Sequence, residues 1–139
     1  MERRNFLKAA AITGVAGISL SACAETQKGQ GEPLGSGGYI LHSVYFWLKP
    51  GLTEDEERDF LNFFEALRKV PGIRSLTFGK PAPTNPRPVV NNSFSYHLVV
   101  TFNSMDDINV YEKHPQHTSA AEKYSKYWDR VEVRDTVFD

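Results

Sequence analysis

Cysteine is nearly absent from this chain of 139 residues, which contains only Cys23. A single thiol cannot form an intramolecular disulfide, so a disulfide-stapled fold is excluded. Clusters of lysine and arginine are absent beyond residue 8, and the net charge is −1, which argues against nucleic acid as a partner. Gly-x-Gly-x-x-Gly, P-loop and Gly-x-Ser-x-Gly motifs are also missing, so nothing indicates a dinucleotide site, a P-loop ATPase or an α/β-hydrolase.

Long hydrophobic runs are scarce as well. The small and apolar run Ala9–Leu20 is shorter than the ~20 residues that a membrane-spanning helix needs. A basic segment with Arg3-Arg4 precedes this run, and Leu20-Ser-Ala-Cys23 ends it. This order of positive charge, apolar residues and small residues predicts a signal peptide over residues 1–22.

The end of this leader resembles the lipobox of bacterial lipoproteins, and Arg3-Arg4 resembles a twin-arginine (Tat) export signal. The resemblance implies an exported protein, lipidated on Cys23 and held at the periplasmic or cell-surface side of a membrane. Three of the 16 basic residues and one of the 17 acidic residues lie in the leader, so the mature chain would carry a net charge of −3. The glycine-rich residues 23–38 lack apolar periodicity and predict a flexible tether before a single domain over residues 39–139.

We predict β-strands in four segments of this domain. In each of them apolar side chains alternate with others, or residues with high β-propensity are in the majority. The segments are Tyr39–Leu48, Ile73–Gly79, Phe94–Phe102 and Trp128–Phe138. Both faces of the first segment are largely apolar, so both should be covered. Helices of a small domain can cover one face of a sheet, and a second copy of the chain would cover the other.

Helix signals fill the intervals between these strands. One helix begins at a capping box on Thr53 and runs to about Lys69. Another begins at Ser104 and ends near Lys113, because Pro115 disfavours helical geometry at the preceding residue and suits the first position of a new helix. The order β-α-β-β-α-β predicts an α+β, ferredoxin-like fold, with a four-stranded antiparallel sheet and helices on one face.

Candidate chemistry gathers in Tyr111-Glu-Lys-His-Pro-Gln-His117. His117 should lie in the first turn of the helix that Pro115 opens, where the helix dipole disfavours imidazolium. A neutral imidazole can accept a proton, and Tyr111 can donate a hydrogen bond to a carbonyl oxygen. The stretch therefore predicts proton abstraction next to a carbonyl, with His42 and His97 as pocket partners from the central strands if their side chains share a face.

A metal site is one alternative for these residues. The histidines could supply four nitrogens, but their spacing matches no specific zinc motif. Purely structural roles are another alternative, because a strand histidine is often only hydrogen-bonded and a His-Pro corner such as His114-Pro115 is often only a helix cap. We predict no metal and no cofactor.

Three segments resemble the stress-responsive α/β-barrel (Dabb) domain family over Ile40–Phe138. These segments are His42-Ser-Val-Tyr-Phe-Trp-Leu48, Tyr96-His-Leu-Val-Val-Thr-Phe102 and Tyr111-Glu-Lys-His-Pro-Gln-His117. The resemblance implies a ferredoxin-like homodimer whose two sheets meet as a barrel. It also implies polyketide-cyclase-like chemistry, an aldol-type condensation without metal or cofactor, in which Tyr111 and His117 are catalytic and His42 and His97 line the pocket.

Three classes of function follow from these observations. The first is binding of a small, largely apolar carbonyl compound, with lyase-like acid–base catalysis by His117 and Tyr111. The second is a non-catalytic, stress-related ligand-binding dimer. The third is a cofactor-free monooxygenase or heme-handling protein. The first class requires His42, His97, Tyr111 and His117 to converge on one enclosed cavity.

Overall fold

The computed structural model describes residues 37–139. The predicted signal peptide, Cys23 and nearly all of the predicted tether lie outside this range. The elements, in chain order, are β1 (Tyr39–Leu48), α1 (Glu54–Leu67), β2 (Ser75–Gly79), β3 (Tyr96–Phe102), α2 (Met105–Lys113), α3 (Pro115–Tyr124), the 3₁₀ helix η2 (Ser125–Tyr127) and β4 (Trp128–Phe138). Within the described residues, no helix is both long and apolar enough to cross a bilayer.

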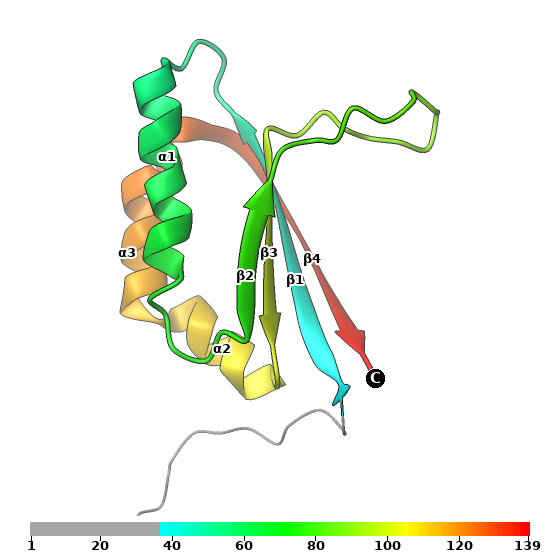
Figure 1. Ribbon diagram of the computed structural model, residues 1–139. Helices are drawn as coiled ribbons and strands as arrows, with labels where there is room; N and C mark the ends of the chain where they lie inside the picture. Colours follow the sequence, from blue (N-terminus) through cyan, green and yellow to red (C-terminus); the bar gives the residue numbers. More distant parts are fainter. Residues whose placement is uncertain (1–36) are drawn as a thin grey trace, which may run out of the picture.

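The four strands form one antiparallel sheet in the order β2-β3-β1-β4. Figure 1 shows α1 and α3 packed on one face of this sheet, with α2 at the end of the helical layer. The predicted ferredoxin-like arrangement, with helices on one side and the second helix broken in two, is therefore confirmed.

Helix α1 is stabilised by a capping box at its N-terminus and by a stripe of aromatic side chains that packs against the sheet. The Thr53 side chain accepts a hydrogen bond from the backbone N–H of Glu56, and the Glu56 carboxylate accepts one from the Thr53 backbone. This reciprocal pair satisfies donors that a helix N-terminus otherwise leaves free. The side chains that α1 buries against the sheet recur at helical spacing and are Phe60, Phe63, Phe64 and Leu67.

The break between α2 and α3 is the feature that positions the candidate site. His114 has extended geometry, with φ −63° and ψ 135°, and Pro115 occupies the first turn of α3. The Nδ1 atom of His114 accepts a hydrogen bond of 3.1 Å from the backbone N–H of Gln116. His114 is thus the N-cap of α3, which confirms the predicted helix break and the capping role.

Strand β3 begins at Tyr96, two residues later than predicted. Ser95 continues the contact with β1 in a different way: its backbone N–H donates to the Phe46 carbonyl, and its Oγ accepts from the Leu48 N–H. A side chain therefore replaces the strand ladder at this point. Strand β2 is also shorter than predicted, because the turn at Gly72, whose φ is +88°, is followed by two residues, Ile73 and Arg74, that are not yet part of the strand.

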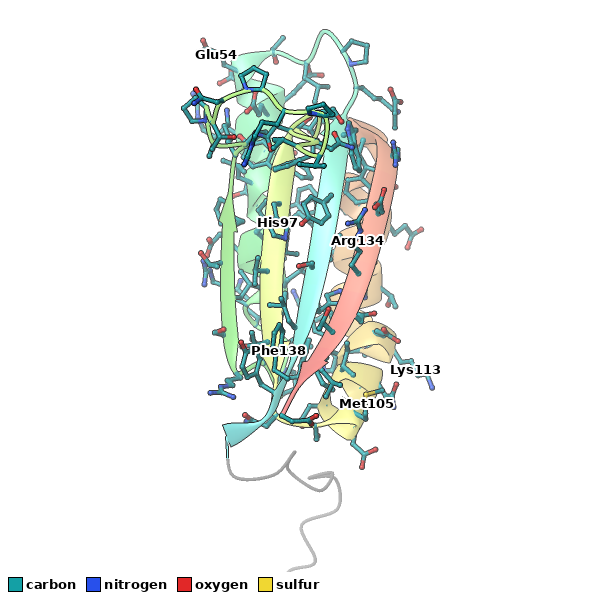
Figure 2. The ribbon with its side chains drawn as sticks, turned by 90° about the vertical axis from the view of Figure 1, so that its right-hand side faces the viewer. Glu54, His97, Met105, Lys113, Arg134 and Phe138 are labelled. Atoms are coloured by element: carbon teal, nitrogen blue, oxygen red, sulfur yellow. The ribbon has the colours of Figure 1, made fainter. Side chains whose placement is uncertain are left out.

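The two faces of the sheet have different surroundings. The helix-covered face holds the core side chains of β1 and β3, which include Ile40, Phe46, Leu98 and Val100. The other face carries no helix, and Figure 2 looks onto it, with His97 and Arg134 labelled there. We call it the open face. On β4, the valines on the helix side of the sheet remain exposed, and they are Val131, Val133 and Val137.

Candidate active site

A pocket of about 410 Å³ lies between the helix-covered face and the helices. Most of its lining is apolar. The polar exceptions are two histidines, one tyrosine and one glutamate, and the full lining is His42, Val44, Phe46, Phe63, Leu67, Leu98, Tyr111, Glu112, His117, Ala121, Trp128, Val131 and Val133. An apolar cavity with a few convergent polar groups has the usual character of a small-molecule site.

Three of the residues predicted from the sequence meet in this pocket. The ring centroid of Tyr111 lies 5.8 Å from that of His42 and 4.6 Å from that of His117. Each comes from a different element: His42 from β1, Tyr111 from α2 and His117 from α3. The helix break at Pro115 lets α2 and α3 each direct one of these side chains toward the sheet.

Tyr111 is equipped to donate a hydrogen bond. Its side chain is almost completely buried and lines the pocket. Burial, followed by the nearby Glu112 carboxylate, raises the pKa of Tyr111 well above its ordinary value. The phenol therefore keeps its proton at neutral pH and has that proton available for a ligand in the pocket.

His117 is equipped to accept a proton. Burial, reinforced by the neighbouring His42, lowers the pKa of His117, while an interaction with the Glu112 backbone acts in the opposite direction. The lowered pKa agrees with the neutral imidazole predicted from the sequence, although burial rather than the helix dipole is its main cause. The Nδ1 atom of His117 is buried without a partner among the described residues, and such atoms are uncommon in native proteins.

Asp135 belongs to the site, and the sequence reading missed it. Its Oδ1 atom accepts a hydrogen bond of 2.6 Å from Nδ1 of His42, since β1 and β4 pair these two residues directly. A proton on Nδ1 leaves Nε2 of a neutral His42 as the acceptor. One signal could have revealed Asp135: it interrupts a face of β4 otherwise formed by Val131, Val133 and Val137.

His97 does not join the pocket, so only three of the four residues expected to converge do so, and any catalysis in the pocket would rest on His42, Tyr111 and His117 without His97. Strands β1 and β3 pair His42 with Val100 and Tyr45 with His97. Because side chains alternate along a strand, this register places His97 on the open face, as Figure 2 shows. There its ring stacks on Tyr45 with centroids 4.2 Å apart, and its Nε2 lies 3.2 Å from Oγ of Ser43.

Within residues 37–139, no group of three or more histidine, cysteine, aspartate or glutamate side chains is arranged to hold a metal ion. The proposed lipidation residue, Cys23, lies outside the described range.

The fold and the pocket agree with what this chain is similar to. The sequence profile of the Stress responsive A/B Barrel Domain (Dabb) matches residues 40–138. The chain belongs to this family. Its relatives include olivetolic acid cyclase from Cannabis sativa, which is 21% identical over 97 residues that cover 69% of this chain and 93% of that protein.

Solved structures share the Dabb fold. A dimeric protein of unknown function with a ferredoxin-like fold from Bacteroides fragilis has a TM-score of 0.55 at 25% identity, covering 72% of this chain and 96% of that one. Hydroxynitrile lyase from Passiflora edulis has a TM-score of 0.61 at 15% identity, covering 73% and 94%. These similarities support the ferredoxin-like architecture of the chain. The chemistry has to be inferred from the residues of the pocket.

Proposed function

We propose that this Dabb-domain protein binds a small, largely apolar carbonyl compound in the pocket and makes or breaks a carbon–carbon bond beside the carbonyl without a cofactor. The observation that carries the proposal is the convergence of a protonated phenol, Tyr111, and a neutral imidazole, His117, on one apolar cavity. The names of two similar proteins, a cyclase and a hydroxynitrile lyase, fit chemistry of this kind.

The proposed cycle begins with a proton transfer. His117 takes a proton from the carbon next to the carbonyl, and the electron pair of that C–H bond forms the enolate. The Tyr111 hydroxyl donates a hydrogen bond to the enolate oxygen, where the negative charge develops. The enolate carbon then attacks a second carbonyl of the substrate, and the resulting alkoxide takes back the proton from the His117 imidazolium. Atoms and charge balance without any further reactant.

His42 has a positioning and binding role in this proposal. The hydrogen bond from its Nδ1 to Asp135 fixes the ring, so Nε2 is available on the pocket side for a hydrogen bond with the substrate. His42 also lies close enough to His117 to contribute to the lowered pKa of that base. Asp135 acts through His42 and is a positioning residue.

Exchange of protons with deuterated solvent tests this proposal directly. The probe is 4-methylacetophenone, whose acetyl protons lie next to a carbonyl. We expect the wild-type protein to accelerate exchange of these protons, as followed by ¹H NMR, and His117→Ala to lose the acceleration. If the probe binds but neither protein accelerates exchange, the pocket is a binding site without catalysis. Mass spectrometry of a co-purified ligand, compared between wild type and His117→Ala, would identify the natural compound.

A homodimer formed through the open face is part of the proposal. Aromatic and aliphatic side chains of β1 lie half-buried on this face, including Tyr39, Leu41, Tyr45 and Trp47. The loop of residues 80–95 projects beyond the sheet on the same side, away from the helices (Figure 1). The similar protein from B. fragilis is dimeric. Light scattering that finds a stable, soluble monomer of the domain would contradict this arrangement.

Export and lipid anchoring complete the proposal and depend on residues 1–23. The basic segment, the apolar run and the small residues before Cys23 stand in the order of a lipoprotein leader. We expect the protein in the membrane fraction, with an intact mass that shows cleavage before Cys23 and added acyl chains. Cys23→Ser should release it into the soluble exported fraction. An unmodified, uncleaved N-terminus in the wild-type protein would contradict the anchor.

A further inference from the structure

The charge of the pocket is one-sided. Among the described residues that line it, Glu112 is the only one with a full formal charge, and no lysine or arginine belongs to the lining. A second carboxylate, that of Asp135, stands behind His42. One negative group therefore borders the cavity directly, and a second contacts one of its lining residues, while no positive side chain lines the cavity.

The arginine side chains of β4 point away from the pocket. On β4, Arg130 lies over the ring of Trp47 and Arg134 over that of Tyr45, both on the open face. Both guanidinium groups also form ion pairs of 2.6 Å with Glu132. These arginines are on the opposite side of the sheet from the pocket and do not compensate its carboxylates.

Glu112 is placed to act on a ligand as well as on the site. It follows Tyr111 on α2, and its side chain is exposed at the border of the pocket. After burial, the Glu112 carboxylate is the second cause of the raised pKa of Tyr111. Its field therefore reaches the position where a bound carbonyl compound would meet the phenol.

We infer that the pocket selects neutral or cationic carbonyl compounds and rejects carboxylates, with Glu112 as the residue that sets this preference. The inference rests on the proposed function and names the class of ligand that the same site takes. A carboxylate that enters the cavity loses its hydration without gaining a cationic partner. Glu112 adds like-charge repulsion, which is a common means of rejecting the wrong ligand. An ammonium group at the border would instead be attracted.

Three acetophenones with one shape and three charges provide the test. They carry a para methyl group, a para carboxylate or a para aminomethyl group: 4-methylacetophenone, 4-acetylbenzoate and 4-(aminomethyl)acetophenone. Binding is measured by NMR titration of the wild-type protein at about pH 7.5. We expect 4-acetylbenzoate to bind at least ~10-fold more weakly than 4-methylacetophenone, which is a difference of about 1.4 kcal/mol.

Substitution of Glu112 tests its part in the selection. Because this carboxylate is exposed and partly screened by salt, Glu112→Gln should tighten 4-acetylbenzoate binding by only about threefold and weaken binding of the amine by a similar factor. Glu112→Lys should tighten 4-acetylbenzoate further. The matched control is Glu122→Gln, which removes an exposed carboxylate outside the pocket lining and should change none of the three affinities.

The outcomes separate this inference from the function on which it rests. If 4-methylacetophenone binds and 4-acetylbenzoate binds equally well or more tightly, the charge selection is wrong while the carbonyl site stands. If Glu112→Gln leaves the preference of wild type unchanged, Glu112 does not set it. If none of the three compounds binds, the proposed function itself fails.

Discussion

Two histidines on the adjacent central strands have opposite surroundings. His42 lies on the helix-covered face, bonded to Asp135 and close to Tyr111, whereas His97 lies on the open face, stacked on Tyr45. The same residue type in the same sheet thus belongs to a pocket in one case and to a flat aromatic surface in the other. The difference comes from strand register, which decides the face on which each side chain emerges.

The largest contrast between the faces should appear in catalysis. His117→Ala removes the proposed base and should slow solvent exchange of 4-methylacetophenone by about 10²- to 10⁴-fold, the usual contribution of a general base. Tyr111→Phe should slow exchange as well, because the developing enolate loses its hydrogen-bond donor. His97→Gln, on the open face, should leave the rate within about twofold. A large loss in His97→Gln with an intact dimer would contradict the separation of the faces.

A smaller effect is expected from the residue that holds His42. Asp135→Asn removes the negative charge that accepts the hydrogen bond from Nδ1 of His42. A hydrogen bond to a charged group contributes about 1.5–3 kcal/mol, so exchange should slow by about 10- to 100-fold. The slope of rate against pH should also change, which a purely structural role would not cause. Asp139→Asn, at the exposed C-terminus, is the control.

On the open face, the expected effect is on association. His97→Gln loses the stacked contact with Tyr45 and should weaken the proposed dimer, or the folded domain, by about 1 kcal/mol. Analytical ultracentrifugation and urea unfolding measure the two possibilities separately. Unchanged values in both measurements would mean that the stacked pair contributes nothing to either.

The smallest of the expected effects is the dependence of stability on pH. It should involve histidines on both faces of the sheet. Burial lowers the pKa of His97, and burial, followed by the influence of the neighbouring His42, lowers the pKa of His117. Unfolded histidine titrates near ~6.5, so below this pH the unfolded chain binds more protons than the folded chain. The free energy of unfolding should therefore have its highest value above about pH 6.5 and decrease as the pH falls below about 6.5.

Urea unfolding at about pH 8 and about pH 5.5 measures this dependence. The midpoint should be lower at the acidic pH, and the difference should shrink in His97→Gln and in His117→Gln. If both variants keep the full difference between the two pH values, the burial of these imidazoles does not govern stability in this range.

Most of the fold could be predicted from the sequence because its signals are local. The capping box at Thr53, the helix break at Pro115 and the bounds of the first and last strands all depend on neighbouring residues. The ends of β2 and β3 were predicted less well. At Ser95 a side chain takes over the bond to Leu48, which no alternation pattern reveals.

The site could be predicted only in part, for a physical reason. Tyr111 and His117 are close in sequence, and the helix break brings them together. The places of His97 and Asp135 depend on how distant strands align, and a single strand does not reveal its register with another. A shift of one residue between β1 and β3 would have exchanged the faces. The carboxylate among the valines of β4 was the one available sign of Asp135.

An NMR titration of the four histidine side chains tests the central claim most directly, because it reads both faces of the sheet in one sample. The account predicts that His117 titrates below ~6.5, and that 4-methylacetophenone shifts the signals of His117 and His42 but not that of His97. A His117 pKa well above ~6.5, or a ligand response confined to His97, would contradict it.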